Sequence, residues 1–507
     1  MAESRGREKQ IIQERIKKIE NLRKEGINPY PNKFELMDLR THSINIKEEF
    51  TALKNGENSR TKKVIAGRVT IKRSFGKLSF LNIQDLKGTI QTTIQKGECP
   101  EEVIKTFKKI DAGDIIGVKG TVTKTKTGEI SLLAQEIFIL TKSILPLPDK
   151  HKGLKDEEER LRKRYLDIIM NSEVKELFLK KQKFWQAVRN FLQEEGFLEV
   201  ETPILEASAG GAAATPFETH HNALDTDVFL RISMGELWQK KLLVAGYEKT
   251  FEIGRQFRNE GMDSEHLQDY SQMEFYWGYA SFEDGMKLVE KMYKAIAITT
   301  LGKLEFKAGE HIVDMGKKWK RYDFETLIKE KTGIGIYEAS KEDIMKKLDQ
   351  LKMEYDPKVD KWRLVDLLWK YCRKSLSGPG FLVGQPVELT PLAKRSTKDP
   401  RKVEQFQVIL GGSEVGNGYS ELNDPIDQEN RFNEQRELKE AGDSEAHDHD
   451  ETFVEALKYG MPPACGFGFS ERLFSFMMNR PIRECVAFPL MKPEATSAKD
   501  KKPKKKK

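Results

Sequence analysis

Residues 251–279 read FEIGRQFRNEGMDSEHLQDYSQMEFYWGY. Apolar and polar residues alternate at both ends of this stretch, which is the pattern of a half-buried β-strand. The two runs predict an antiparallel hairpin whose long tip spans residues 261–271. One face of each strand is apolar and predicts a core, whereas the other combines glycines with acidic residues and a tyrosine. Arg258 and Glu260 fall on this polar face, where they indicate either a structural ion pair or the floor of a binding site.

Two later segments carry the same mixture of glycine and charge. Residues 411–424 read GGSEVGNGYSELND. Repeated glycine weakens a strand, which indicates either the close approach of a ligand or a bulged strand with chance acids. Glu414 and Glu421 of this segment offer the hard oxygen ligands that suit Mg²⁺ bound to phosphates. Residues 466–478, GFGFSERLFSFMM, predict a strand followed by a helix that begins near Arg472. An arginine and a helix N-terminus both attract phosphate, although a core helix with one exposed arginine has the same pattern.

Composition bounds the class of protein. The 507 residues predict roughly two to four domains, and 38% hydrophobic with 33% charged residues is typical of a soluble globular chain. The net charge of +7 fits a protein with one basic face better than a wholly basic coat. The four cysteines are scattered, which excludes a disulfide scaffold or cysteine-rich zinc site and favours a reducing compartment. Because no apolar run of about 18 residues and no signal-peptide core occurs, we expect a cytoplasmic protein without membrane association.

The chain changes character along its length. Residues 8–26 predict an amphipathic basic helix, which either packs on its own protein or also contacts RNA phosphates. Five strand-like runs follow over residues 63–141 and favour a small OB-type β-barrel, with an SH3-like barrel or a plain meander as alternatives. We expect these domain limits: a helical extension over 1–60, the barrel over 61–143, a linker over 144–160, a large domain over 161–495 with a helical insertion at about 310–380, and a disordered Lys-rich tail over 496–507.

Taken in order, these segments resemble the signature motifs of the class II aminoacyl-tRNA synthetases, and in detail the family of class II lysyl-tRNA synthetases, nearly end to end. ERLRKRYLDIIMN with the following helix resembles motif 1, FRNEGMDSEH through MEFYWGY resembles motif 2, and GFGFSER resembles motif 3. THHNALD, ELTPLAKR and NGYSELNDPIDQ also match, and the last two are specific to the lysine enzymes.

This resemblance implies an α+β fold, in which a class II antiparallel-sheet catalytic domain follows an N-terminal five-stranded OB-type barrel that binds the anticodon. It implies ATP-dependent ligation of L-lysine to tRNA(Lys) through lysyl-adenylate, with Mg²⁺ as cofactor. It also implies a homodimer that forms through the motif 1 region.

The resemblance further implies roles for single residues. Arg258 is expected at the ATP α-phosphate and the lysine carboxylate, and Arg472 at the γ-phosphate, so these two are the expected catalytic residues. Glu260 and His266 are expected near the adenine, and Tyr270 is expected to stack on it. The expected lysine pocket consists of Gly211, Glu236, Arg258, Tyr276, Asn417, Tyr419 and Glu421. Glu414, which also belongs to the ATP site, and Glu421 are expected to coordinate Mg²⁺, and Arg73, Phe80 and Gln91 to contact a uridine-rich anticodon.

The sequence departs from the family pattern in three places. RISMGELWQK has one residue more than the usual R-I-A-P-E-L, EHLQDY stands where H-N-P-E-F is usual, and Ser470 and Glu471 precede Arg472 where a G-x-D-R ending is typical. Three other functions share part of the pattern. An aspartyl- or asparaginyl-tRNA synthetase needs a basic pocket, a ligase that attaches lysine to protein lacks the barrel, and a non-catalytic paralogue has no reason to keep Arg258, Glu414, Glu421 and Arg472.

Overall fold

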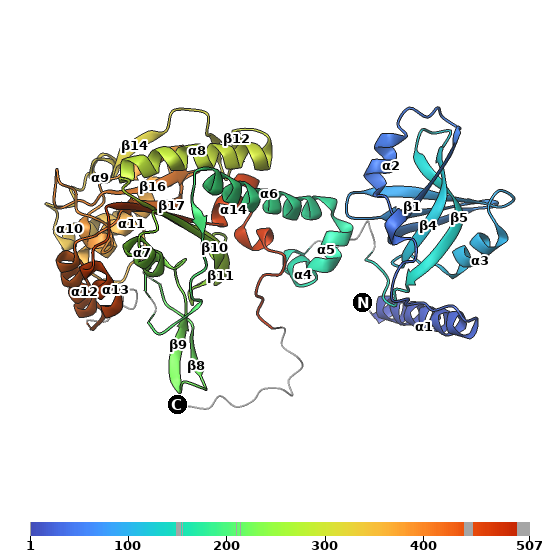
Figure 1. The fold of residues 1–507 in the computed structure, drawn as a ribbon, viewed down its shortest axis with the longest axis horizontal. Coiled ribbons are helices and arrows are strands. Elements are labelled where there is room, and N and C mark those ends of the chain that lie inside the picture. The colour runs from blue at the N-terminus through green and yellow to red at the C-terminus, as the bar shows by residue number, and fades with distance from the viewer. Residues whose placement is uncertain are drawn as a thin grey trace. The chain divides into compact units, whose positions relative to one another are not determined.

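The computed structural model describes residues 2–148, 154, 156–208, 210–212, 214–440 and 450–493. The chain separates into two compact units, Met1–Asp156 and Glu157–Lys507, and each is described by itself (Figure 1). The Lys-rich tail predicted over 496–507 lies outside the described residues. Of the linker predicted over 144–160, residues 149–153 and 155 also lie outside them.

The first unit is a closed five-stranded barrel with the strand order β1-β2-β3-β5-β4. All neighbouring strands are antiparallel except β3 and β5, which are parallel. Its strands are β1 (Asn58–Phe75), β2 (Leu78–Gln84), β3 (Thr89–Gln95), β4 (Ile115–Lys124) and β5 (Ile130–Thr141), with helix α3 (Glu101–Lys109) between β3 and β4. Alternate residues of the strands point inward and form an apolar core. The closed pairing confirms the predicted five-stranded barrel and excludes an open meander.

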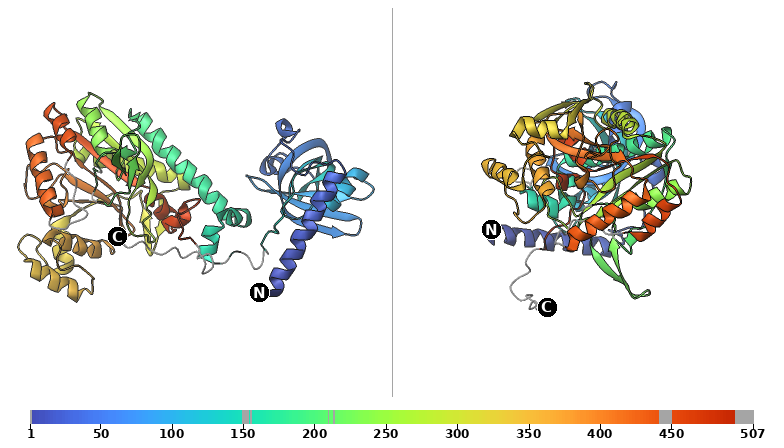
Figure 2. Two further views of the ribbon diagram at one scale, coloured as in Figure 1. Left: turned by 90° about the horizontal axis from the view of Figure 1, so that it is seen from below. Right: turned by 90° about the vertical axis from the view of Figure 1, so that its left-hand side faces the viewer.

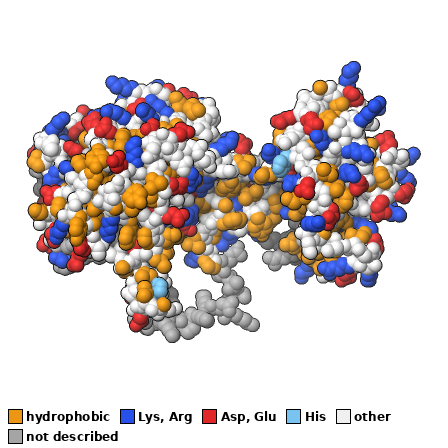
Figure 3. All heavy atoms as spheres, viewed as in Figure 1, with side chains coloured by type: hydrophobic (Ala, Val, Ile, Leu, Met, Phe, Trp, Pro, Cys, Tyr) orange, Lys and Arg blue, Asp and Glu red, His pale blue; other side chains and the backbone are white. Residues whose placement is uncertain are grey.

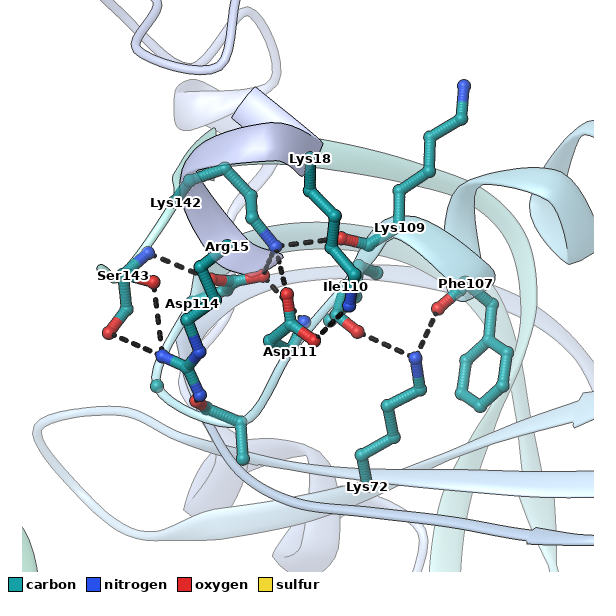
Figure 4. A network of polar contacts seen from close by, with 12 residues as sticks. Arg15, Lys18, Lys72, Phe107, Lys109, Ile110, Asp111, Asp114, Lys142 and Ser143 are labelled. Carbon is teal, nitrogen blue, oxygen red and sulfur yellow. Dashed lines mark hydrogen bonds and ion pairs between the residues drawn. The ribbon is translucent and has the colours of Figure 1, made fainter. Parts of the chain in front are cut away.

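Helices α1 (Ala2–Lys24), η1 (Met37–Leu39) and α2 (Ser43–Glu49) precede this barrel. Ile19 and Leu22 of α1 are buried. Arg15 of α1 donates hydrogen bonds to three backbone carbonyls at 2.8–3.0 Å (Figure 4). Beside it, the buried Lys142 ammonium lies 2.5 Å from Asp114 and 2.8 Å from Asp111. The prediction that this helix packs on its own protein is confirmed, and contact with RNA stays a prediction.

The second unit is built on an eight-stranded sheet with the order β14-β15-β16-β17-β18-β11-β10-β6. Pairing is antiparallel except at the two edges, where β14 with β15 and β10 with β6 are parallel. The strands are β6 (Leu198–Glu199), β10 (Lys249–Phe257), β11 (Asp269–Gly278), β14 (Lys320–Asp323), β15 (Gly380–Val383), β16 (Gln405–Leu410), β17 (Ser413–Ser420) and β18 (Ala464–Ser470). Helices α6 (Ser172–Glu194) and α8 (Phe282–Leu301) lie side by side over one face and bury its core (Figure 1). The opposite face carries the polar side chains of the site.

The remaining elements surround this sheet. Helices α4 (Glu157–Arg162) and α5 (Arg164–Met170) precede α6, and α7 (Glu236–Val244) precedes β10. Strands β7 (Leu205–Glu206), β8 (Glu218–His221) and β9 (Thr226–Leu230) form a small sheet, and β12 (Glu305–Ala308) pairs with β13 (His311–Asp314). The later helices are α9 (Phe324–Thr332), α10 (Lys341–Gln350), α11 (Lys361–Arg373), η2 (Val387–Leu389), α12 (Pro425–Glu440), α13 (Glu451–Lys458), α14 (Arg472–Met478) and η3 (Ile482–Cys485).

The helical insertion predicted at about 310–380 needs a correction. Residues 320–323 form β14, which pairs with β15 as the edge strand of the main sheet. Only α9 to α11 form a helical lobe (Figure 2). Its apolar core also includes Leu382 and Ile409 of the main sheet. The sequence KRYD of β14 is charged because an edge strand exposes one side to water, so it lacks the apolar alternation of a strand.

The hairpin that opened the sequence analysis is present. β10 pairs with β11 so that Phe251 lies opposite Phe275 and Glu252 opposite Glu274. Both phenylalanines are fully buried in the core, as predicted. However, β10 ends at Phe257, and the Asn259 N–H donates to the Thr215 carbonyl instead of to the partner strand. The prediction that Arg258 and Glu260 share a strand face is therefore wrong, because the chain has already turned there.

None of the helices in the described ranges combines the length and apolarity that a membrane span requires. On the face drawn in Figure 3, lysine and arginine side chains are interspersed with acidic ones over each unit. The net charge of +7 is thus not gathered into one basic patch on that face.

Candidate active site

The second unit holds a cavity of about 400 Å³ on the face of its sheet opposite to α6 and α8. Its walls come from β11, β17 and β18, from the long tip of the hairpin and from the start of α14. The predicted site residues that line it are Gly211, Glu236, Arg258, His266, Tyr270, Tyr276, Glu414, Asn417, Tyr419, Glu421 and Arg472. The fold therefore brings together residues that lie as far apart as 211 and 472 in the sequence.

One end of the cavity is a cluster of buried acids around a buried lysine. Glu236 begins α7, and Lys240 follows one turn later with its ammonium 2.7 Å from Glu236. The same ammonium lies 2.5 Å from Glu421. The Tyr419 hydroxyl donates to Glu236 at 2.5 Å. Glu236 and Glu421 thus share one ammonium, and Glu274 of β11 adds a third buried carboxylate to the cavity wall.

Glu421 has capacity for a further partner. Apart from its ion pair with Lys240, both of its carboxylate oxygens are buried without a hydrogen-bond partner among the described residues. Burial raises the pKa of Glu421 to about 8, although the Lys240 ammonium opposes this effect. Burial likewise raises the pKa of Glu274 to about 7, and Glu274 accepts a hydrogen bond from the Tyr276 hydroxyl at 3.0 Å. Glu274 also accepts from the Met234 N–H and the Gln272 amide, so Glu421 is the underpaired acid of the two. Such an acid suits a cationic ligand, whose charge lowers its pKa again.

The glycines of β18 explain how these acids fit over the sheet. A Cβ on Gly466 would lie 2.0 Å from a Glu421 oxygen and 2.7 Å from the Tyr276 ring. A Cβ on Gly468 would lie 2.7 Å from the Glu274 side chain. At these two positions glycine therefore makes room for side chains of the pocket itself.

The other end of the cavity carries two arginines. The Arg258 Nε donates to the Ile232 carbonyl at 3.2 Å, and its guanidinium lies 6.0 Å from the Tyr270 ring centroid. Arg472 begins α14 and lies 2.7 Å from the carboxylate of Glu265. An acidic pocket at one end and two cations at the other suit a ligand pair that is cationic at one end and anionic at the other.

Two of the three predicted adenine contacts, His266 and Tyr270, line the cavity, and the third, Glu260, does not. His266 lines the cavity and its Nδ1 lies 2.8 Å from Asp263, while the Tyr270 hydroxyl accepts a hydrogen bond from the Gln256 amide. Glu260 is exposed and does not line the cavity, because the turn after Phe257 directs the chain away. The structure therefore does not place Glu260 with the other site residues.

The lining residues missing from the prediction include Glu265 and Glu274, and the buried Lys240, which pairs with the lining residues Glu236 and Glu421, was missing as well. Lys240 lies four residues after Glu236 on one helix, and this i to i+4 spacing of opposite charges is a signal that could have identified it. Glu274 was visible on the polar face of its strand beside Tyr276. Glu265 lies in the irregular hairpin tip, where no periodicity indicates a direction.

The barrel of the first unit carries the predicted anticodon contacts on one outer surface. Arg73 of β1 lies directly opposite Phe80 of β2, and Gln91 of β3 lies opposite Asn82, two residues after Phe80. Since side chains alternate along a strand, these three residues share a face. Phe75, which is 64% exposed, makes an edge contact with Phe80 at 6.4 Å between ring centroids and extends this surface.

Comparison with known proteins agrees with both units. The family described as "tRNA synthetases class II (D, K and N)" matches residues 156–492, and "OB-fold nucleic acid binding domain" matches residues 63–140. The chain is 43% identical to a lysine–tRNA ligase of Pelotomaculum thermopropionicum over 97% of both chains. It is 41% identical to a lysine–tRNA ligase of Thermotoga maritima, over 96% of this chain and 97% of that one. The chain therefore belongs to the class II tRNA synthetases, and within them to the family of lysine–tRNA ligases.

Proposed function

We propose that this chain activates L-lysine with ATP and transfers it to tRNA(Lys) through lysyl-adenylate. The observation that carries the proposal is the polarity of the cavity, in which Glu236, Glu274 and Glu421 gather at one end and Arg258 and Arg472 at the other. Lysine with its carboxylate placed against the α-phosphate of ATP has the matching distribution, with the side-chain ammonium at one end and the phosphates at the other.

Selectivity for lysine follows from the buried acids. An amino acid with a neutral side chain leaves the Glu421 Oε1, which has no partner among the described residues, still unpaired. Sites whose buried polar groups are left unpaired by the wrong substrate reject it by roughly 10⁴ or more. An aspartate or asparagine side chain adds a carboxylate or amide to an already acidic pocket, so we expect exclusion of both.

In the first step, a carboxylate oxygen of lysine attacks the α-phosphorus of ATP, a new O–P bond forms, and pyrophosphate leaves. The lysine carboxylate is already ionised near neutral pH, so the step needs no protein base. We assign Arg258 to the α-phosphate and the lysine carboxylate, and Arg472 to the terminal phosphate. Catalysis then rests on positioning and on charge stabilisation in a site fixed before the reaction. In the second step, a terminal ribose hydroxyl of the tRNA attacks the carbonyl carbon and AMP leaves.

The residues present fit a Mg²⁺ ion that is held mainly by ATP. Among the described residues, no group of three or more His, Cys, Asp or Glu side chains is arranged to hold a metal alone. Glu414 lines the phosphate end of the cavity and can supply one oxygen ligand. Glu421 fits less well, because it lies at the opposite end of the cavity, beside the Lys240 ammonium. When bound, Mg²⁺ supplies positive charge to the triphosphate.

We further propose that Arg73, Phe80 and Gln91 bind the anticodon of the tRNA, with Phe80 stacking on a base for about 1–3 kcal/mol. We also propose a homodimer through the motif 1 region, which is supported by a groove of about 570 Å³ that is lined by α6, with Leu179 and Phe191, and by Ala295 and Thr299 of α8. All four cysteines are unpaired, and we propose a reducing cytoplasmic location, where translation supplies the substrates.

The test is incubation of the purified chain with labelled lysine, ATP, Mg²⁺ and bulk tRNA. We expect label in the nucleic-acid fraction, released by ribonuclease and by mild base, with AMP and pyrophosphate formed. Label that stays with protein after ribonuclease treatment indicates a protein–lysine ligase, and no label in either fraction indicates a non-catalytic paralogue. Either result contradicts the proposal.

A further inference from the structure

The Arg472 guanidinium already has an anionic partner in this cavity, because a carboxylate of the same chain forms an ion pair with it. The Glu265 Oε2 lies 2.7 Å from an Arg472 terminal nitrogen. The Ser413 hydroxyl joins the two, since it donates to Glu265 at 2.9 Å and also contacts Arg472. Both charged residues line the cavity. Among the described residues, Glu265 is therefore the acid that forms an ion pair with Arg472.

The segment that presents Glu265 is anchored on both sides. The Asp263 carboxylate accepts the backbone N–H groups of Glu265 at 2.7 Å and His266 at 2.9 Å. On the next turn, Leu267 is buried in an apolar cluster with Ile482, whose N–H donates to the Ser264 carbonyl at 2.9 Å. These contacts order the backbone around Glu265, so little conformational entropy is lost when its side chain pairs with Arg472.

A carboxylate and a terminal phosphate compete for the same guanidinium. Each presents at least two anionic oxygens that a guanidinium can bridge, and arginine binds each through charge-assisted hydrogen bonds. A phosphate that reaches Arg472 while Glu265 stays in place brings two like charges together in a partly buried site, which is unfavourable. The Arg472 side chain is 16% exposed and that of Glu265 is 36% exposed. Glu265 therefore has a route to water when it leaves.

We propose that Glu265 is an internal substitute for the terminal phosphate of ATP, which neutralises Arg472 in the empty cavity and gives way when a nucleoside triphosphate enters. The inference rests on the proposed role of Arg472. It makes Glu265 a residue that sets affinity for triphosphate and pyrophosphate without contacting the nucleoside. After adenylate formation, the same carboxylate competes with pyrophosphate for Arg472 and promotes its release.

The competition has a definite sign. Removing the carboxylate removes the competitor, so Glu265→Gln tightens the binding of ATP and of inorganic pyrophosphate by on the order of tenfold, the equivalent of one charge-assisted contact. AMP lacks the β- and γ-phosphates of ATP, so its dissociation constant stays unchanged. If Glu265 had only a structural role, its replacement would change the dissociation constants of all three ligands in the same direction.

The experiment measures dissociation constants of ATP, inorganic pyrophosphate and AMP by calorimetry with Mg²⁺ present, on the full chain and on Glu265→Gln. Asp269→Asn is the matched control, since it removes an equal charge from the base of the same hairpin tip, where Asp269 pairs with the exposed Arg255 outside the cavity. The inference predicts that Glu265→Gln binds ATP and pyrophosphate more tightly than the parent and binds AMP with an unchanged dissociation constant. The control Asp269→Asn should bind all three ligands as the parent does. Weaker ATP in Glu265→Gln overturns it, because the carboxylate then contributes to binding, and unchanged ATP overturns it as well.

Arg472→Gln separates this inference from the proposed function. If Arg472 binds the terminal phosphate, this variant weakens ATP and pyrophosphate but not AMP. If it leaves ATP binding unchanged, the assignment of Arg472 fails whatever Glu265 does. Thermal unfolding of each variant shows whether the fold is retained.

Discussion

At the scale of single residues, the cavity keeps charges that a folded protein ordinarily avoids burying. Lys240 is fully buried, and its ammonium lies 5.6 Å from the Tyr419 ring centroid and 6.0 Å from that of Tyr276. Two carboxylates, those of Glu236 and Glu421, pair with it, and Glu421 has no other partner among the described residues. Buried, incompletely paired acids cost folding free energy, and proteins retain them where a ligand supplies the partner.

The first prediction concerns Glu421. Glu421→Gln keeps the size of the side chain but removes the charge that we propose pairs with the substrate amine, so lysine-dependent exchange of pyrophosphate into ATP should fall to background. Lys240 retains its ion pair with Glu236, so the variant stays folded. Exchange assays and thermal unfolding measure the two effects. Glu218→Gln, on the exposed strand β8, is the control and keeps full activity. Near-normal exchange in Glu421→Gln contradicts the account.

A second residue gives a pH prediction. Burial raises the pKa of Glu206 from 4.5 to about 7, although the Trp238 N–H donates to its carboxylate at 2.9 Å. The folded state therefore holds this proton more tightly than the unfolded state. The resulting stability is complete below about pH 4.5 and is lost as pH rises through 7, with a difference of about 3 kcal/mol.

Glu206→Gln keeps the hydrogen bond to Trp238 and does not titrate. Relative to the parent, its free energy of unfolding should therefore rise between pH 5 and pH 8. Urea unfolding of both proteins at the two pH values measures this difference, in which other titrating groups cancel. Parallel pH dependences of the two proteins are incompatible with the raised pKa.

At the scale of elements, the alternation of apolar and polar residues predicted the strands that bury one face and expose the other. The hairpin of β10 and β11 and the five barrel strands were readable because each buries one face. Arg258 and Glu260 were misplaced because the end of β10 is set by a hydrogen bond to Thr215, 44 residues earlier by its number. β14 was missed because an edge strand of four residues has no apolar face to repeat. The approach of Glu265 to Arg472 depends on loop geometry, which a sequence pattern does not encode.

β18 provides a test at this scale. Its glycines leave space for the acids of the pocket, and a methyl group on Gly466 would lie 2.0 Å from a Glu421 oxygen. Gly466→Ala should therefore displace Glu421 and raise KM for lysine by at least about tenfold, equivalent to 1.4 kcal/mol. Steady-state exchange kinetics with varied lysine and then varied ATP measure the split. An increase in KM for ATP alone is the contrary result.

At the scale of the whole molecule, the two units divide the work. Every cavity residue belongs to the second unit, and the surface of Arg73, Phe80 and Gln91 belongs to the first. Amino-acid activation should therefore proceed without the barrel surface, whereas tRNA charging should need both. The two reactions can be assayed separately on the same protein.

Phe80→Ala tests this division. Loss of one stacked base contact, about 1–3 kcal/mol, should raise KM for tRNA in aminoacylation by about 5- to 150-fold and leave lysine-dependent pyrophosphate exchange unchanged. Both rates are measured on one preparation. An equal fall in both reactions contradicts the division, since it places Phe80 in the stability of the whole chain.

The central claim is that the acidic end of the cavity selects lysine. The most direct measurement is ATP–pyrophosphate exchange by the purified chain with each of the twenty amino acids in turn, without tRNA. The account predicts exchange with lysine that exceeds every other amino acid by roughly 10³-fold or more in kcat/KM. Exchange that is fastest with aspartate or asparagine, or absent with lysine, contradicts it.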